Sequence, residues 1–159
     1  MAQACGVIRL GPWGRETPTE NRSFVGKIEE IVVCHDVVIN SITFFGRDGN
    51  DKPFVIKFGG DGGTPHKVGF ACDEYITNIA GAYGYWLNKK GTYVTAITFV
   101  TNLGTTYGPF GNLEDKPAGV TKDTVKFYGP LMDNATIAGF FAYCDHYVQN
   151  IGMNVRSTA

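Results

Sequence analysis

The sequence contains no long apolar segment and carries almost no net charge. None of its apolar runs approaches the roughly 20 residues that a membrane-spanning helix needs. Its opening segment, MAQACGVIRLGPWG, lacks the basic region followed by an apolar region that marks a secretory signal peptide. The formal net charge of −1 gives no electrostatic footprint for nucleic acid or an anionic membrane. We therefore expect a cytoplasmic protein, with the nucleus as a second compartment, that binds no nucleic acid and does not insert into a membrane.

The sequence also lacks a metal or redox motif. Its four cysteines, Cys5, Cys34, Cys72 and Cys144, form no Cys-x-x-Cys pair. In a reducing compartment we expect free thiols, two or three of them buried as apolar packing. The sequence therefore predicts no metal site and no cofactor.

No catalytic motif is recognisable. His35-Asp36 and Asp145-His146 each place a histidine beside an aspartate, but adjacent side chains of a strand point to opposite faces. Cys144 precedes the second pair, yet no nucleophile elbow accompanies it. Because adjacency in sequence does not create triad geometry, we expect a protein that is not an enzyme.

The composition favours a single all-β domain over residues 1–159. Of the residues, 43% are apolar, 18% are charged and 13% are aromatic, and 21 are glycines. Short runs rich in Val and Thr alternate with glycine-containing turns every 8–12 residues, which is typical of a closed or prism-like β architecture. The expected strands are Val7–Leu10, Ser23–Cys34, Val37–Phe45, Phe54–Phe58, an extended Thr64–Ala80, Tyr93–Val100, Thr105–Tyr107, Val125–Tyr128, Ile137–Phe141 and Tyr147–Val155, with Gly81–Lys90 as an aromatic loop or ribbon.

Two features recur three times along the chain. The hexapeptides INSITF, VTAITF and VQNIGM begin at Ile39, Val94 and Val148, so they are 55 and 54 residues apart. Glycine-rich segments recur about 49 residues apart, as GPWG from residue 11, GGDGG from residue 59 and GPFG from residue 108. A nearly constant interval of this size indicates that one supersecondary unit is repeated three times along the chain.

These segments resemble the jacalin-related lectins. The matching stretches are Gly11–Gly14, Ile39–Phe44, Gly59–Pro65, Glu74–Gly81, Thr98–Asn102, Thr106–Gly111 and Ile137–Phe141. The resemblance implies a β-prism I fold of three four-stranded Greek-key sheets with pseudo-threefold symmetry. It also implies metal-free binding of mannose-, glucose- or galactose-type sugars at one end of the prism, in mostly plant proteins that form dimers or tetramers.

The resemblance places the main sugar site where two loops meet. In the family a Gly-Gly turn follows the first GPWG motif, and a Gly-x-x-x-Asp motif precedes the last strand. Here Arg15 follows Gly14, and an ungapped alignment puts Asp145 at the motif's glycine and Gln149 at its aspartate. Gln149 can still bond two hydroxyls, as one donor and one acceptor, and Asp145 offers a carboxylate from a shifted position. The predicted carbohydrate-binding residues are Gly14, Arg15, Asp145, His146, Tyr147 and Gln149, with the loop of residues 88–92 beside them.

The other two repeats depart further from the family pattern. Gly62-Gly63 keeps the glycine loop of the middle repeat, but its partner motif, read as residues 35–39, lacks both the glycine and the aspartate. The third loop has Glu114-Asp115 where a glycine pair is expected.

Several neighbouring residues have two interpretations. Tyr83, Tyr85 and Trp86 either stack beside the site or pack into the core, and core packing is favoured for at least one of them. Arg15 with Glu16 is either a solvated pair or a sugar contact, and His66 is expected at the surface.

We therefore expect a non-catalytic lectin with a degenerate site that prefers mannose- or glucose-type glycans over galactose. Its partners would be glycans or glycoproteins. It would form a homodimer or larger homo-oligomer, because weak single sites require avidity. The alternative is an interaction scaffold that keeps the prism and has lost monosaccharide binding.

Overall fold

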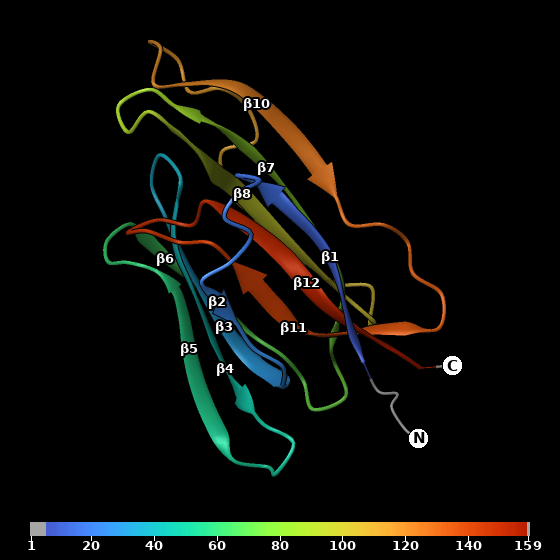
Figure 1. Cartoon of the computed structure of the whole chain (residues 1–159). Helices are drawn as coiled ribbons and strands as arrows, with labels where there is room; N and C mark the ends of the chain where they lie inside the picture. The colour runs from blue at the N-terminus through green and yellow to red at the C-terminus, as the bar shows by residue number, and fades with distance from the viewer. Residues whose placement is uncertain (1–5, 159) are drawn as a thin grey trace.

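The computed structural model describes residues 6–158, which form twelve strands and contain no helix (Figure 1). The all-β prediction is confirmed, and in this part of the chain no helix is long and apolar enough to cross a membrane. The strands are β1 (Val7–Gly14), β2 (Arg22–Ser23), β3 (Lys27–His35), β4 (Ile39–Arg47), β5 (Pro53–Gly59), β6 (Thr64–Gly69), β7 (Ile76–Trp86), β8 (Gly91–Thr101), β9 (Thr106–Gly111), β10 (Thr121–Tyr128), β11 (Ala135–Ala142) and β12 (Asn150–Ser157).

The strands form three four-stranded sheets of the same design. Their orders are β6-β3-β4-β5, β10-β7-β8-β9 and β2-β11-β12-β1. In each sheet the fourth strand of the unit returns to lie beside the first, which is the Greek-key order. In the last sheet β1 pairs with β12, so the N-terminal strand completes a unit that begins near the C-terminus. The predicted three Greek-key sheets with pseudo-threefold symmetry are therefore confirmed.

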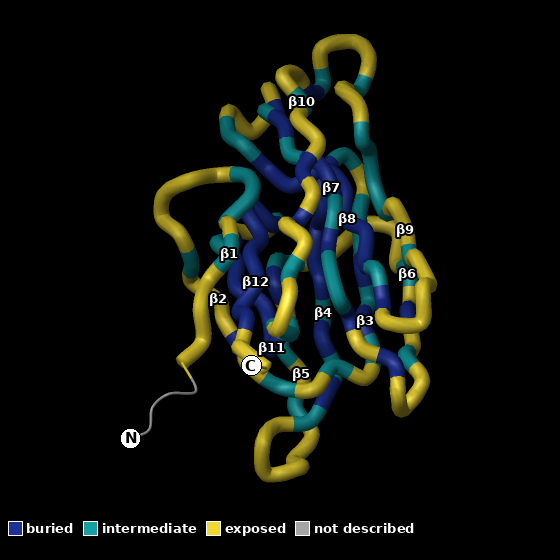
Figure 2. The backbone as a smooth tube through the Cα atoms, turned by 90° about the vertical axis from the view of Figure 1, so that its right-hand side faces the viewer, coloured by how far each residue is buried: buried dark blue, intermediate teal, exposed yellow. Residues whose placement is uncertain are grey.

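The repeated hexapeptides form the central strands β4, β8 and β12. Their equivalent isoleucines and the large residue two positions later are at most 1% exposed, and they belong to one continuous core. Figure 2 shows these strands as the darkest, most buried part of the tube. Burying each such side chain contributes about 1.5–3 kcal/mol, so the repeat makes a substantial contribution to core stability. The six residues are Ile42, Ile97, Ile151, Phe44, Phe99 and Met153.

A glycine ends each of the edge strands β1, β5 and β9, and it brings the backbone unusually close to that of the neighbouring strand. Gly14, Gly59 and Gly111 have φ values of +119°, +101° and +105°, which favour glycine. A Cβ atom at any of these glycines would overlap a carbonyl oxygen in or just before the neighbouring central strand. The oxygens are those of Gln149 for Gly14, Asn40 for Gly59 and Thr95 for Gly111. We call the end of the prism that carries these three glycines the tip, and the opposite end, where β3, β7 and β11 begin, the base.

At the tip, one residue of the last repeat joins all three sheets. The N–H of Val148 donates to the carbonyl oxygen of Ile39 at 3.0 Å, and the N–H of Val94 donates to the carbonyl oxygen of Val148 at 2.9 Å. These are the first residues of the three hexapeptides. The sequence repeat therefore corresponds to a structural junction.

Several segments differ from the predicted strands. β1 continues past Leu10 to Gly14, the strand predicted over residues 23–34 is divided into β2 and β3, and β12 begins at Asn150 rather than Tyr147. Of the two readings of residues 81–90, loop or ribbon, the extended one holds for residues 81–86, which end β7, and only residues 87–90 turn into β8. The end of β7 was not recognised as part of one long strand because Gly81, Ala82 and Gly84 have low β-propensity. The extended segment predicted over residues 64–80 is divided into β6 and the start of β7, and β10 begins at Thr121 rather than Val125.

The described cysteines are free thiols, as predicted, and Cys5 lies outside the described residues. Cys144 is buried, Cys34 is half-buried and Cys72 is exposed, so burial accounts for one of these three. Burial raises the pKa of the Cys144 thiol to about 12, which makes it a packing residue and not a nucleophile.

Candidate functional site

The structure brings the turn after β1 against the loop between β11 and β12, as predicted. The N–H of Arg15 donates to the carbonyl oxygen of Gln149 at 2.9 Å. Only glycine fits at position 14, because a side chain there would overlap that carbonyl oxygen. We call this meeting of residues 14–17 with residues 143–149 the first cradle.

Asn150 fastens the two halves of the first cradle. Its side-chain oxygen accepts the N–H of Tyr143 at 2.6 Å, and its amide nitrogen donates to the carbonyl oxygen of Arg15 at 2.7 Å. Asn150 is fully buried, so these bonds are shielded from water. Asn150 was not among the predicted site residues.

The Arg15 side chain lies across the cradle and does not pair with Glu16. Its Nε donates to the carbonyl oxygen of Thr17 at 2.7 Å, and its Nη1 donates to Oε1 of Gln149 at 3.2 Å. The guanidinium also lies 5.2 Å from the ring centre of Tyr143. Gln149 is only 3% exposed, and its amide oxygen is already occupied by the hydrogen bond from Arg15.

Asp145 is exposed, and its carboxylate is held by one bond within the loop and one bond from β8. Oδ1 accepts the N–H of Tyr147 at 2.8 Å, and Oδ2 accepts the hydroxyl of Tyr93 at 2.9 Å. Each carboxylate oxygen keeps a second lone pair for a ligand hydroxyl. Burial, and then the bond to Asp145, raises the pKa of Tyr93 to about 12, so Tyr93 remains a donor throughout the physiological range.

An aromatic cluster supports the loop from below. The rings of Trp86, Tyr93 and Tyr147 contact one another edge to face, with ring centres 5.0–5.9 Å apart. The ammonium of Lys89 lies 5.7 Å from the Tyr147 ring centre. Trp86 is only 8% exposed, so the prediction that at least one aromatic of β7 packs inside is confirmed.

The backbone of His146 lies against the glycine loop of the middle repeat. The residue is exposed, and its backbone lies so close to Gly60 that a Cβ there would be 2.8 Å from the His146 carbonyl oxygen. The structure therefore places His146 between the first cradle and the glycine loop that follows β5.

A polar hollow of about 480 Å³ opens beside the first cradle. It is lined by the turn after β1 and by Tyr83 and Thr92 of the neighbouring sheet, and residues 145–149 are not among its lining residues. Arg15 belongs to both the hollow and the cradle. Of the predicted loop over residues 88–92, only Thr92 reaches the hollow.

The middle repeat forms a second cradle in a register that differs from the predicted one. The structural equivalent of Gln149 is Asn40, so the motif is Asp36-x-x-x-Asn40 and not residues 35–39. The equivalent of the Gly14-Arg15 turn is Gly59-Gly60, whose second N–H donates to the carbonyl oxygen of Asn40 at 3.0 Å. The second cradle consists of residues 36–40 and residues 59–63.

Asn40 carries an unpaired acceptor inside this second cradle. The side chain is 7% exposed, and its Oδ1 has no hydrogen-bond partner within residues 6–158. Oδ1 lies so near Gly63 that a Cβ there would be 2.8 Å away. A buried polar atom without a partner is costly, so this oxygen is an unsatisfied acceptor inside the second cradle.

The third repeat keeps the backbone contact, since the N–H of Asn112 donates to the carbonyl oxygen of Thr95 at 2.8 Å, but the polar side chains of its loop are already paired. Glu114 forms an ion pair with Lys126 at 2.9 Å, and Asp115 accepts the N–H of Thr124 at 2.9 Å. The amide of Asn112 donates to the carbonyl oxygens of residues 36 and 37. These side chains therefore bond to other parts of the protein and stabilise the fold.

His66 is not the surface residue that we expected. It is half-buried, and its Nε2 lies 3.0 Å from Nε2 of His35 on the neighbouring strand β3. One imidazole must therefore donate to the other. Burial, and then the charge of His66, lowers the pKa of His35. Within residues 6–158, no group of three or more His, Cys, Asp or Glu side chains could hold a metal ion.

The sequence matches the family model of the jacalin-like lectin domain over residues 10–154. The chain belongs to the jacalin-like lectin family. A mannose/glucose-specific lectin of Parkia pendula is 33% identical over 159 residues, which are 95% of this chain and 32% of the relative. This lectin domain thus spans about a third of the length of that protein. The jacalin-related lectin Calsepa of Calystegia sepium is 31% identical over 152 residues, which are 89% of this chain and 90% of the relative.

Solved structures of jacalin-related lectins have the same fold as this lectin domain. Calystegia sepium agglutinin superposes with a TM-score of 0.78 at 26% identity and covers 98% of this chain and 99% of its own. Calsepa lectin is also known in complex with a biantennary N-glycan. A mannose-binding jacalin-related lectin from Ananas comosus superposes with a TM-score of 0.77 at 25% identity, covering 96% of this chain and 99% of its own. The predicted β-prism is therefore confirmed.

Proposed function

We propose that this lectin domain is a non-catalytic protein that binds mannose- or glucose-type glycans at the tip. Its family and the names of its relatives support this proposal. The proposed contacts in the first cradle are Gly14, Arg15, Asp145, His146, Tyr147 and Gln149. The observation that carries the proposal is the 2.9 Å bond from Arg15 to Gln149, which brings the two predicted halves of the site together.

The first cradle offers both kinds of group that a sugar hydroxyl needs. The free guanidinium N–H groups of Arg15 donate, and the second lone pairs on the Asp145 carboxylate accept. Bonds to charged groups are the stronger class, so Arg15 and Asp145 should contribute most of the affinity. Tyr147 presents a ring edge that is fixed by the aromatic cluster.

The second cradle is proposed as a further place for the same kind of ligand. Its glycine loop leaves main-chain N–H groups accessible, and Asn40 Oδ1 is an acceptor that lacks a partner in the described chain. Because His146 lies between the cradles, one branched glycan could contact both.

The scaffold alternative is less well supported, because the relatives that match nearly the whole chain are called lectins. We further propose that the protein acts in the cytoplasm or nucleus. We also propose that it works as a homodimer or larger homo-oligomer, since weak sites gain useful affinity through multivalency.

The test is a titration with mannose, glucose and galactose, followed by calorimetry and by amide NMR shifts. We expect shifts at Arg15, Asp145 and Tyr147 with mannose and glucose. Asp145→Asn should weaken binding about tenfold, because the neutral amide loses the charge-assisted bonds. The matched control is Asp133→Asn, which neutralises an exposed aspartate near the base.

Two outcomes would decide against the proposal. A parent protein that binds no sugar and no oligomannose on a glycan array supports the scaffold alternative. Sugar binding that is unchanged in Asp145→Asn, with shifts confined to residues 36–63, would move the site to the second cradle.

A further inference from the structure

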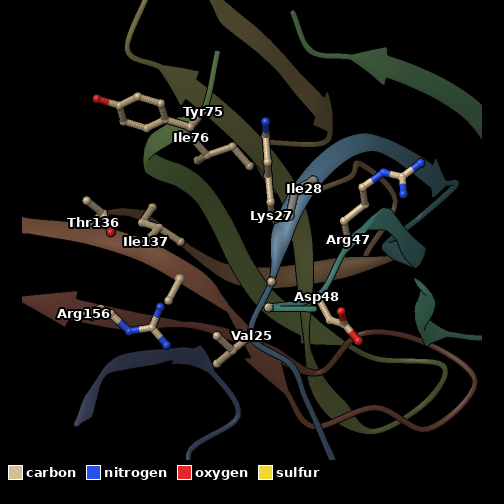
Figure 3. A pocket seen from close by; sticks show the side chains of 13 residues that line it. Val25, Lys27, Ile28, Arg47, Asp48, Tyr75, Ile76, Thr136, Ile137 and Arg156 are labelled. Atoms are coloured by element: carbon tan, nitrogen blue, oxygen red, sulfur yellow. The ribbon is translucent and has the colours of Figure 1, made fainter. Parts of the chain in front are cut away.

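The base of the prism contains a pocket that is separate from the tip (Figure 3). Its volume is about 460 Å³, within the range of roughly 300–1,000 Å³ that is usual for small-molecule sites. Residues from all three sheets line it, since β3, β4, β7, β11 and β12 each contribute. The lectin function proposed for the tip does not use this pocket.

The walls of the base pocket are apolar. Ile76 and Ala138 are buried, Ile28 and Ile137 are half-buried, and Val25 is 42% exposed at the mouth. In Figure 3 the side chains of Ile76, Ile28 and Ile137 surround the same space. A sugar would find few hydroxyl partners on such walls, whereas an apolar ring would lose little by leaving water.

The mouth of the base pocket is cationic. Arg156 is exposed, and its guanidinium forms no ion pair or hydrogen bond within residues 6–158. The ammonium of Lys27 donates one bond of 3.3 Å, to the carbonyl oxygen of Cys72, and keeps its other N–H groups. The one carboxylate at the mouth, Asp48, already accepts the N–H groups of Asn50 and Lys52.

Arg47 contributes less to this positive charge than its position suggests. It lies 3.5 Å from the carboxylate of Glu29 and donates to the carbonyl oxygen of Asp51 at 3.0 Å. Figure 3 shows Arg47 and Asp48 on one side of the pocket, and Arg156 with Ile137 on the other. Of the two arginines, Arg156 is therefore the one whose charge is uncompensated, and it lies directly beside an apolar wall.

We propose that the base pocket binds a small molecule made of an apolar ring and one carboxylate. The ring would occupy the space between the isoleucines, and the carboxylate would accept two parallel N–H bonds from Arg156. Planar pairing of guanidinium with carboxylate is the strongest polar contact that this mouth can offer.

The experiment uses the full chain with 1-naphthoate as the probe and 1-naphthalenemethanol as its uncharged counterpart. We expect 1-naphthoate to bind about tenfold more tightly than the alcohol, because only the carboxylate pairs with Arg156. Arg156→Gln should reduce 1-naphthoate to the affinity of the alcohol, and Arg156→Lys should lose part of the difference. Amide NMR shifts should lie at residues 25–28 and 136–138.

The matched control is Arg22→Gln, which removes an exposed arginine at the tip end of the prism and should leave both affinities unchanged. Mannose should not displace 1-naphthoate, so the two sites fail or succeed independently. The proposal is overturned if the two compounds bind equally, if Arg156→Gln has no effect, or if shifts lie at the tip. Absence of binding by 1-naphthoate at about 1 mM, near the weak end of specific affinities, also overturns it.

Discussion

The hydroxyl of Tyr93 on β8 donates a 2.9 Å hydrogen bond to Oδ2 of Asp145, in the loop between β11 and β12. The bond joins two repeats of the prism at the tip. Tyr93 is buried and Asp145 is exposed, so one end of the bond is anchored in the core while the other end is available to a ligand. The carboxylate is thereby held in position before a sugar arrives.

Removing this hydroxyl should loosen the tip without unfolding the prism. We expect Tyr93→Phe to lower the free energy of unfolding by about 1 kcal/mol, the usual net worth of a hydrogen bond. Mannose affinity should fall as well, because Asp145 loses its orientation. Urea unfolding and calorimetry measure the two effects. The same substitution at Tyr128, which is exposed at the end of β10, should change neither.

The raised pKa of Tyr93 adds a pH signature to the same variant. The folded state holds the proton more tightly than the unfolded state, whose tyrosine titrates near 10. The stabilisation is therefore complete below pH 10 and is lost as the pH rises toward 12. We expect the stability difference between parent and Tyr93→Phe to shrink over this interval, and a constant difference would contradict the assignment.

The repeat could have indicated the Tyr93–Asp145 contact. Tyr93 and Tyr147 each precede the first residue of a hexapeptide, and Val38 holds the equivalent position before the hexapeptide that begins at Ile39. In the structure Val38, Trp86 and Tyr93 form one buried cluster with Tyr147 packed against it. Aligned repeats place equivalent residues near a common axis, so these positions were predictable as neighbours. The direction of the hydroxyl was not, because it depends on the loop conformation.

Other parts of the site depend on contacts that no repeat encodes. The sequence shows that Arg15 occupies a position where the family has glycine. It does not show that the Arg15 guanidinium donates to Gln149, which is 134 residues away in the chain. Likewise, His66 is an ordinary polar residue of an edge strand in the sequence. Only the register of β3 against β6 shows that it meets His35. Side-chain pairing across strands follows from register, which the composition does not determine.

The close approach at Gly14 gives a stability prediction. Gly14→Ala should lower the free energy of unfolding by about 1–3 kcal/mol, because the residue has φ +119° and the new methyl group would overlap the carbonyl oxygen of Gln149. The matched control is Gly69→Ala, where a Cβ meets nothing within 4 Å. Equal melting temperatures for the two variants would show that the strand end yields to the added methyl group.

The paired, half-buried imidazoles of His35 and His66 predict sensitivity to acid. The pKa of His35 is lowered below its ordinary 6.5 by burial and by His66, so the folded state disfavours its protonation. The stabilisation is present above pH 6.5 and is lost as the pH falls through the lowered value. We expect the unfolding free energy of the parent to decrease below pH 6.5 more steeply than that of His35→Gln.

A second histidine variant serves as the control for this slope. His146 is exposed in the loop before β12, so His146→Gln should keep the acid sensitivity of the parent. If both variants follow the parent curve, the acid sensitivity arises from groups other than the His35–His66 pair.

The unpaired oxygen of Asn40 leads to a prediction for gain of binding. Asn40→Asp keeps the shape of the side chain and converts a neutral acceptor into a carboxylate beside the glycine loop of residues 59–63. A carboxylate forms stronger bonds with adjacent hydroxyls, so mannose affinity at the second cradle should rise about five- to tenfold. The protein should also become less stable, because the residue is only 7% exposed and the charge is partly desolvated without a ligand.

Calorimetry with mannose and a thermal melt measure both effects of Asn40→Asp. Asn50→Asp, which adds the same charge in the exposed turn between β4 and β5, controls for net charge and should change neither. A loss of stability without any gain in affinity would mean that no sugar hydroxyl reaches Asn40. The second cradle would then be a structural counterpart of the first, and glycan binding would depend on Arg15 and Asp145 alone.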